Sequence, residues 1–310
     1  MFLGYNTNGL AHHDLFDAVQ LLADIGYRGV AITIDHNALP PHGPHARQRT
    51  ERLRRLLERL GMRSVIETGA RYLLDPATKH DPTLLSAGRR QRIEFYRYAI
   101  DCAAALQSDC VSLWSGVLRE SGSAGTGPFF GGKTPSANRR RAENMDLSPS
   151  AVEQAIDRLA EGLGEVLDYA ARQGVIIGFE PEPGMLIDTL RAFEELLPRI
   201  DRPNLRLTLD IGHLQCQGET PIADVIRRWA PRLGNVHIED MRTGTHEHLM
   251  FGEGEIDFPP VLRALAEVGY TGGLYVELSS HSREGPAAAK RAIDFLQRQM
   301  TNDEITMPKE

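Results

Sequence analysis

The sequence is poor in cysteine, and this scarcity argues against two classes of small scaffold. Its 310 residues include three cysteines, Cys102, Cys110 and Cys216, an odd number without any C-x-x-C spacing. The sequence therefore predicts neither a disulfide framework nor a zinc ribbon. Because free thiols are typical of reducing compartments, we expect a cytoplasmic protein.

Long apolar runs and an excess of basic residues are also missing. No window approaches about eighteen consecutive apolar residues, and the N-terminal segment MFLGYNTNGLAHHD has no charged region followed by an apolar one. We therefore expect neither a membrane span nor a secretory signal peptide. Lys and Arg number 35 against 42 Asp and Glu, a net charge of −7. This balance argues against a nucleic-acid partner.

Strand and helix patterns alternate eight times along the chain. Neither a hairpin dipeptide between strands nor a G-x-G-x-x-G motif after the first strand is present, which disfavours an open doubly wound sheet. The alternation predicts an α/β protein with a single domain over residues 1–310, a (β/α)8 TIM barrel. The predicted strands lie in 2–9, 29–36, 64–69, 110–116, 175–184, 205–213, 234–240 and 272–280, and the predicted helices in 14–25, 47–60, 89–106, 150–170, 190–197, 222–229, 257–268 and 286–300.

One long insertion follows the fourth predicted strand. Residues 117–147 are rich in Gly and Ser and place Phe129 and Phe130 between glycines. Loops after barrel strands cover the C-terminal mouth, and a loop of this length is usually a lid or a disordered segment. The two aromatic residues favour a lid. Residues 301–310 are polar and are expected to form a flexible tail.

Four consecutive strands end in side chains that can bind a metal ion. These are Glu180, Asp210, His237 and Glu277. Active-site groups of such barrels gather at the C-terminal ends of the strands, so we expect the four to converge. Any one of them could be only a salt-bridge partner or a helix cap, but four on successive strands favour a metal site. Oxygen ligands with one imidazole suit Mn²⁺, Mg²⁺ or Co²⁺.

The chain resembles the xylose-isomerase-like superfamily of sugar isomerases and epimerases over essentially its whole length. Ketose 3-epimerases, hydroxypyruvate isomerases and inosose-processing enzymes are the most similar groups. The most specific motifs are D-x-G-H at 210–213, V-H-I-E-D at 236–240, G-E-G-E-I-D-F at 252–258 and Y-V-E at 275–277.

The resemblance implies one divalent ion held by Glu180, Asp210, His237 and Glu277, a small carbohydrate or cyclitol substrate, and a homo-oligomer. It also implies that His213 binds substrate. Two positions depart from the family pattern. Glu182 stands where a second substrate-binding acid is expected, but only two residues after the first glutamate, and Arg242 is the candidate for an arginine that follows the histidine ligand.

The ligand set predicts proton transfer at carbon. A metal ion bound to neighbouring hydroxyl and carbonyl oxygens lowers the pKa of the adjacent C–H group. Of the two catalytic residues, Glu180 and Glu277, one would remove the proton and the other would return it. The sequence therefore predicts a sugar isomerase or epimerase. Loss of a β-leaving group would instead make the protein a lyase, either a dehydratase or a β-eliminating enzyme acting on 3-keto-glycosides, and the ligand set does not choose between these.

Other residues near the predicted mouth are ambiguous. Glu67 and Trp114 end the third and fourth strands and are candidates for substrate contact, although Trp114 could equally form an apolar wall. Asp240 is expected to orient His237 or a loop. His246 and His248 could hold a second metal, but a solvated loop is the preferred interpretation.

Two further functions are less favoured. A DNA-repair nuclease of the endonuclease IV type shares the barrel but needs a three-zinc cluster with histidines on earlier strands, where this chain has Glu67 and Trp114. A barrel without catalytic activity, serving as a binding protein, is disfavoured because all four predicted ligands are intact.

Overall fold

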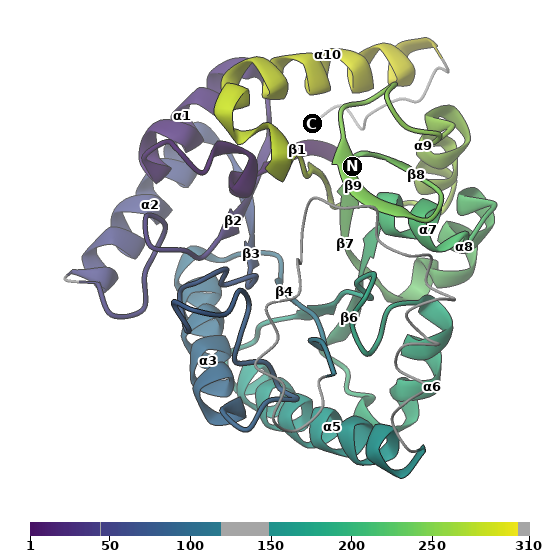
Figure 1. Cartoon of the computed structure of the whole chain (residues 1–310). Coiled ribbons are helices and arrows are strands. Elements are labelled where there is room, and N and C mark those ends of the chain that lie inside the picture. The colour runs from purple at the N-terminus through teal and green to yellow at the C-terminus, as the bar shows by residue number, and fades with distance from the viewer. Residues whose placement is uncertain (44, 119–148, 303–310) are drawn as a thin grey trace.

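The computed structural model describes residues 1–43, 45–118 and 149–302. Its strands form a closed parallel barrel in the order β1-β10-β7-β6-β5-β4-β3-β2 (Figure 1). The predicted TIM barrel is confirmed. The barrel strands are β1 (Phe2–Asn6), β2 (Gly29–Thr33), β3 (Arg63–Glu67), β4 (Val111–Leu113), β5 (Ile177–Phe179), β6 (Leu205–Asp210), β7 (Leu233–Ile238) and β10 (Gly273–Val276).

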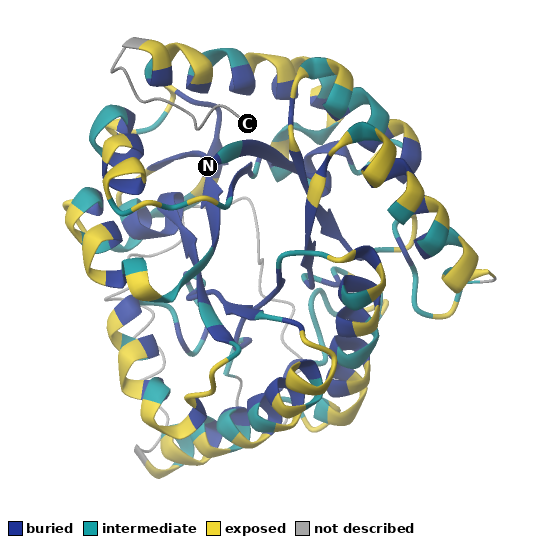
Figure 2. Ribbon diagram, turned by 180° about the vertical axis from the view of Figure 1, so that it is seen from behind, coloured by how far each residue is buried: buried dark blue, intermediate teal, exposed yellow. Residues whose placement is uncertain are grey.

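Helices cover the outside of the barrel, with their buried faces turned toward the strands (Figure 2). They are α1 (Leu15–Ile25), α2 (Ala46–Leu60), α3 (Arg89–Leu106), α5 (Pro149–Arg172), α6 (Leu190–Ile200), α7 (Ile211–Gln217), α8 (Ile222–Trp229), α9 (Phe258–Glu267) and α10 (Gly285–Asn302). Strand β2 is buried along its whole length, as expected for a parallel strand that is covered on both sides.

Local signals set the ends of several helices. The side chain of Asp14 accepts the backbone N–H of Phe16 at 2.8 Å and caps α1, while Thr189 accepts the backbone N–H of Ala192 and caps α6. Gly26 ends α1 with a φ of 114°, a left-handed conformation that glycine adopts without strain.

Two elements beside the barrel were not predicted. Helix α7 begins immediately after β6, and an antiparallel hairpin of β8 (Asp240–Arg242) and β9 (Thr245–Leu249) follows β7. Both are too short to produce a clear periodic pattern. Gly244, with a φ of 72°, turns the hairpin. The segment that contains His246 and His248 is therefore a strand rather than a loop.

Two predictions fall largely outside the described part of the chain. These are the lid at 117–147, beyond residue 118, and the tail at 301–310, beyond residue 302. Over the ranges that are described, no helix is long and apolar enough to cross a bilayer.

A buried arginine forms hydrogen bonds with the backbone of the segment between β3 and α3. Arg92 is fully buried and donates three hydrogen bonds to backbone oxygens: Nε to Pro82 at 2.6 Å, Nη1 to Thr68 at 3.0 Å and Nη2 to His80 at 2.5 Å. Burial lowers the pKa of Arg92. The guanidinium thus holds in place a segment that reaches over the barrel mouth.

We expect Arg92→Leu to lower the free energy of unfolding by about 3 kcal/mol. The substitution leaves the buried carbonyl group of Thr68 and the partly buried ones of Pro82 and His80 without this donor, and a buried unsatisfied group costs about 1–3 kcal/mol. Urea denaturation measures the change. Arg90→Leu is the matched control, because Arg90 lies on the same helix with its side chain 65% exposed, and it should leave the unfolding midpoint nearly unchanged. Equal effects of the two substitutions would contradict this role for Arg92.

Candidate functional site

The candidate site lies at the C-terminal ends of β5, β6, β7 and β10. Glu180 follows β5, Asp210 ends β6, His237 lies in β7 and Glu277 follows β10. The sheet register places Asp210 directly beside His237. Glu277 has the most exposed side chain of the four, at 16%. The barrel thus brings all four predicted ligands to one point.

The imidazole of His237 is the centre of this cluster. Its Nδ1 lies 3.1 Å from Glu180 Oε1, 3.2 Å from Glu277 Oε2 and 3.7 Å from Asp210 Oδ2. Asp210 Oδ2 is buried and has no hydrogen-bond partner in the described part of the chain. Three carboxylates around one imidazole are an excess of buried negative charge, which needs protons or a cation. The donor set therefore fits a divalent metal ion.

The pKa shifts show the same excess of negative charge. Burial raises the pKa of Glu180 to about 8, with a further contribution from Asp210 and Glu277 and an opposing one from His237. Burial lowers the pKa of His237, but Glu67 and Glu180 raise it more, so that it stands well above its ordinary value. Without a metal, the cluster therefore retains protons that a bound cation would displace.

The D-x-G-H run explains how Asp210 is positioned. Its Oδ1 accepts the backbone N–H of His213 at 2.7 Å and caps α7. This leaves Oδ2 for the cluster. A Cβ at Gly212, between them, would lie 2.1 Å from the carboxylate of Glu239 and would displace that side chain. His213 is buried, with Nδ1 3.6 Å from Glu180 Oε1.

Glu67 orients the imidazole of His237 from the other side. Its Oε1 lies 3.0 Å from His237 Nε2 and accepts a hydrogen bond from Asn235 Nδ2 at 3.3 Å. An ionised carboxylate can only accept, so an Nε2–H group faces Glu67, and a metal ion would replace any proton on Nδ1, which faces the other carboxylates. Carboxylates commonly orient metal-binding histidines in this way. Glu67, predicted to contact substrate, thus contacts His237 and also borders the cavity.

Two asparagines hold Glu277, and sequence analysis missed both. Asn8 Nδ2 donates to Glu277 Oε1 at 2.8 Å, and Asn6 Nδ2 lies 3.4 Å from Oε2. Asn6 is in turn fixed by Thr33, whose hydroxyl donates to Asn6 Oδ1 at 2.7 Å. The N-T-N run at residues 6–8, at the end of the first strand, could have indicated polar residues at the barrel mouth.

Comparison with known proteins identifies the family of this fold and site. The sequence profile of the xylose isomerase-like TIM barrel matches residues 19–299. The chain belongs to this family. It is 29% identical over 162 residues to inosose dehydratase of Lacticaseibacillus casei, a match covering 47% of this chain and 53% of that protein. The chain spans about half the length of the curated relatives it matches.

Solved structures with the same fold extend over nearly the whole chain. A D-tagatose 3-epimerase-like protein has a TM-score of 0.73 at 23% identity, covering 98% of this chain and 99% of that one. The IOLI protein with a binding zinc atom has a TM-score of 0.71 at 18% identity, covering 97% of this chain and 99% of that one. At these identities the likeness concerns the fold alone.

A cavity of about 580 Å³ lies at the C-terminal mouth of the barrel, where the active sites of such barrels are found. Polar and charged side chains dominate its lining. They include Asn6, Asn8, Thr33, Asp35, Glu67, Arg71, Lys79, His80, Glu180, Glu182, His237, His248, Glu277, Ser279 and Ser280, with Trp114, Tyr72 and Met185 as the larger apolar groups. Such a lining suits a small hydroxylated substrate.

Of the other residues predicted to bind substrate, Glu182 and Trp114 line the cavity and Arg242 does not. Glu182 is buried in the cavity wall, with Oε2 3.8 Å from His213 Nε2. Trp114 also lines the cavity, but His80 packs edge-on against it and the guanidinium of Arg92 lies 5.1 Å from the ring centroid. Arg242 is exposed on β8 and donates to the backbone oxygen of Glu253. The structure therefore does not bring Arg242 to the cavity.

The structure also resolves two ambiguous assignments. Asp240 orients a loop rather than His237, since it accepts the backbone N–H groups of Met241, Gly252 and Ile256. The interpretation of His246 and His248 as solvated loop residues was wrong, because each side chain is only 6% exposed.

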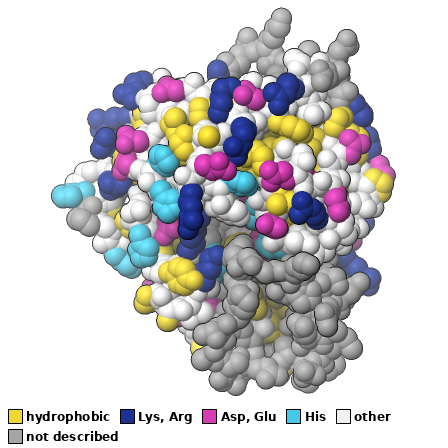
Figure 3. Space-filling view, turned by 45° about the horizontal axis from the view of Figure 1, so that its top comes forward, with side chains coloured by type: hydrophobic (Ala, Val, Ile, Leu, Met, Phe, Trp, Pro, Cys, Tyr) yellow, Lys and Arg dark blue, Asp and Glu magenta, His cyan; other side chains and the backbone are white. Residues whose placement is uncertain are grey.

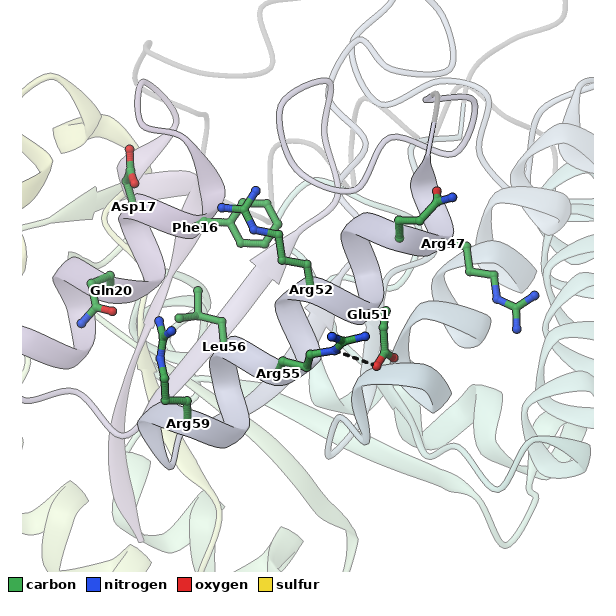
Figure 4. A pocket seen from close by; sticks show the side chains of 10 residues that line it. Phe16, Asp17, Gln20, Arg47, Glu51, Arg52, Arg55, Leu56 and Arg59 are labelled. Atoms are coloured by element: carbon green, nitrogen blue, oxygen red, sulfur yellow. Dashed lines mark hydrogen bonds and ion pairs between the residues drawn. The ribbon is translucent and has the colours of Figure 1, made fainter.

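A larger hollow of about 840 Å³ lies on the outer wall between α1 and α2 (Figure 4). It is lined by arginines of α2, two of which are already engaged: Arg52 lies over the ring of Phe16 at 4.1 Å, and Arg55 pairs with Glu51. None of its lining residues also lines the cavity at the barrel mouth. Acidic and basic side chains are interspersed on the face shown in Figure 3, so no continuous basic patch is visible among its described residues.

We expect Glu67→Gln to weaken binding of Mn²⁺ by about 10–100-fold, because loss of a carboxylate that orients a metal-binding histidine typically has an effect of this size. Calorimetric titration measures the dissociation constant. Glu58→Gln is the control, since Glu58 is 53% exposed on α2, and it should bind like the wild type. An unchanged dissociation constant in Glu67→Gln would contradict the proposed role of Glu67 in orienting His237.

Proposed function

We propose that the protein is a divalent-metal-dependent isomerase or epimerase that moves a proton next to the carbonyl group of a small ketose or cyclitol ketone. The observation that carries the proposal is the placement of Glu180 and Glu277. They approach His237 Nδ1 from β5 and β10, at 3.1 and 3.2 Å, and both line the cavity. Two carboxylates that come from different strands and line the same cavity can serve two faces of a substrate carbon.

Glu180, Asp210, His237 and Glu277 would hold the metal ion. When bound, the ion would act as a Lewis acid toward the substrate carbonyl and favour loss of the neighbouring proton. Mn²⁺, Mg²⁺ and Co²⁺ are the ions we expect for this oxygen-rich set. The zinc bound to the structurally similar IOLI protein makes Zn²⁺ a further candidate.

The chain's own groups would perform the proton transfers. Either Glu180 or Glu277 takes the proton from carbon, and the other carboxyl group delivers one. The asparagines on Glu277 and the contact of His237 with Glu180 restrict both carboxylates, so neither needs to reorganise during the reaction. Return of the proton to the opposite face gives an epimer, and its delivery to the neighbouring carbon gives an isomer.

A lyase is the alternative. The observation that favours it is the raised pKa of Glu182 in the cavity wall. Burial raises the pKa of Glu182 well above its ordinary value, with Glu180 and Glu277 adding to the effect. Once Glu180 or Glu277 has taken the proton from the neighbouring carbon, a protonated Glu182 could give its proton to the departing hydroxyl group, so that the C–O bond breaks, water leaves and a carbon–carbon double bond forms. The similarity to inosose dehydratase supports the same reaction class.

Deuterium NMR separates these reactions. The metal-loaded protein is incubated in D₂O with D-tagatose or with an inosose, the compounds suggested by the two relatives. Uptake of deuterium at carbon with unchanged composition supports an isomerase or epimerase, whereas loss of water supports a lyase. Neither change with any ketose or cyclitol ketone tested would contradict the proposal. A single-domain chain, a cytoplasmic location and a homo-oligomeric assembly remain predictions.

We expect Glu277→Gln to lower kcat by about 10²–10⁴-fold, the usual contribution of a general base or acid. The amide oxygen can still face the metal, so metal content should persist. Glu284→Gln, which changes an exposed glutamate nearby, should retain full activity. Full activity of Glu277→Gln would exclude this carboxylate from proton transfer.

A further inference from the structure

The segment between β3 and α3 brings two basic side chains to the cavity at the barrel mouth. Arg71 and Lys79 both line this cavity, whose wall also carries many acidic and hydroxyl groups. The side chain of Arg71 is 30% exposed, and Lys79 is partly buried. The proposed reaction uses neither residue. Charged groups that share a cavity with the reacting carbonyl are placed to contact the rest of the substrate.

The segment folds back so that the two cations become neighbours. The backbone N–H of His80 donates to the backbone oxygen of Arg71 at 2.5 Å and closes a loop over residues 71–80. Burial and then the positive charge of Arg71 lower the pKa of Lys79 to about 8, while Glu182 opposes the shift. The two positive charges therefore act on each other, and a bound anion would relieve their repulsion.

The first turns of α3 hold this loop in place. Arg92 donates to the backbone oxygen of His80, and Gln91 Nε2 donates to the backbone oxygen of Leu74 at 3.1 Å. Within the loop, Asp75 Oδ1 accepts two backbone N–H groups of the turn that follows it. A segment that is already ordered loses little conformational freedom when a ligand binds. The loop thus presents both cations to the cavity in a prearranged position.

Asn8 connects the basic pair to the predicted metal site. Its Nδ2 donates to Glu277 Oε1 at 2.8 Å, and its backbone oxygen lies 3.4 Å from Arg71 Nη2. One residue therefore contacts both a predicted metal ligand and a cation. A cavity of about 580 Å³ has room for a compound of six carbons. The guanidinium is within reach of the far end of such a compound when its carbonyl group faces the metal site.

The surrounding charges favour a ligand group with a single negative charge. Arg71 Nε lies 4.0 Å from Asp35 Oδ2, so one carboxylate of the protein already balances part of the positive charge. A carboxylate ligand carries one negative charge, and its two oxygens match the N–H groups of a guanidinium. A phosphate ester carries about 1.5–2 negative charges at neutral pH. The pair therefore fits a carboxylate better than a phosphate.

We propose that Arg71 and Lys79 form a subsite for a carboxylate group, so that the substrate is a hydroxylated keto acid whose carboxylate lies away from the reacting carbonyl. The inference rests on the proposed function for the carbonyl end of the substrate. It adds the chemical class of the other end, because a neutral ketose would leave both cations without a substrate contact of opposite charge.

Binding of matched ligands tests the inference. Calorimetric titration of the Mn²⁺-loaded full chain compares D-tagatose with D-tagaturonate, which has a carboxylate in place of the terminal CH₂OH group, and with D-tagatose 6-phosphate. We expect D-tagaturonate to bind about 10–100-fold more tightly than D-tagatose, the usual effect of a hydrogen bond to a charged group. D-tagatose 6-phosphate should bind less tightly than D-tagaturonate.

Two variants show whether the basic pair causes this preference. Arg71→Gln/Lys79→Gln should abolish it and still bind D-tagatose like the wild type, which also shows that the variant has folded. The control Arg90→Gln/Lys290→Gln removes two exposed cations, with side chains 65% and 57% exposed. It should keep the preference of the wild type, because neither residue lines the cavity.

The outcomes separate this inference from the proposed reaction, because binding is measured whether or not the compound reacts. Equal, weaker or undetectable binding of D-tagaturonate relative to D-tagatose overturns the subsite, even if D-tagatose is converted. A preference that persists in Arg71→Gln/Lys79→Gln also overturns it, since the carboxylate then binds elsewhere. Tighter binding of D-tagatose 6-phosphate than of D-tagaturonate overturns the choice of a carboxylate. A preference lost only in this variant, without turnover of either compound, supports the subsite and tells against the reaction.

Discussion

The orientation of one imidazole organises the candidate site. Glu67 holds the Nε2 side of His237, so the Nδ1 side is presented to Glu180, Asp210 and Glu277. Two like charges 4 Å apart repel by about 4 kcal/mol at an effective dielectric constant of 20. Burying three carboxylates together therefore opposes folding unless a positive charge joins them. A bound cation supplies that charge, and the same ion would activate a carbonyl substrate in the proposed reaction.

Two of the four ligand side chains are also tied to neighbouring elements of the fold. Asp210 uses one oxygen to cap α7 and leaves the other for the cluster. Glu277 is held by asparagines from the first strand, which lies next to its own strand in the closed barrel. The site thus depends on barrel closure between β1 and β10 as well as on the strands that carry the ligands. Residues from the two ends of the chain meet there.

The sequence predicted two kinds of feature: elements with a clear hydrophobic periodicity, and polar residues that stand at the ends of strands. The alternating strands and helices indicated the barrel, and the polar residues at strand ends indicated the convergence of Glu180, Asp210, His237 and Glu277. Each of these inferences required only that parallel strands end at the same mouth. The order of elements determines that property, so no side-chain detail was needed.

The contacts that depend on three-dimensional packing were not predictable in the same way. Arg242 is close to His237 in sequence, but the β8 strand directs it to the exposed surface. His246 and His248 were interpreted as solvated, because nothing in their spacing shows that a short hairpin folds back against α7. Glu239 lies between two recognised residues of the V-H-I-E-D run, yet only the structure shows that it is buried beside His248.

The most direct test of the site is a crystal structure of the protein loaded with Mn²⁺, with anomalous diffraction collected at the manganese absorption edge. The account predicts an anomalous peak within about 2.0–2.6 Å of donor atoms from Glu180, Asp210, His237 and Glu277. The absence of a peak between these four side chains, with their carboxylates instead paired to protein groups, would contradict it.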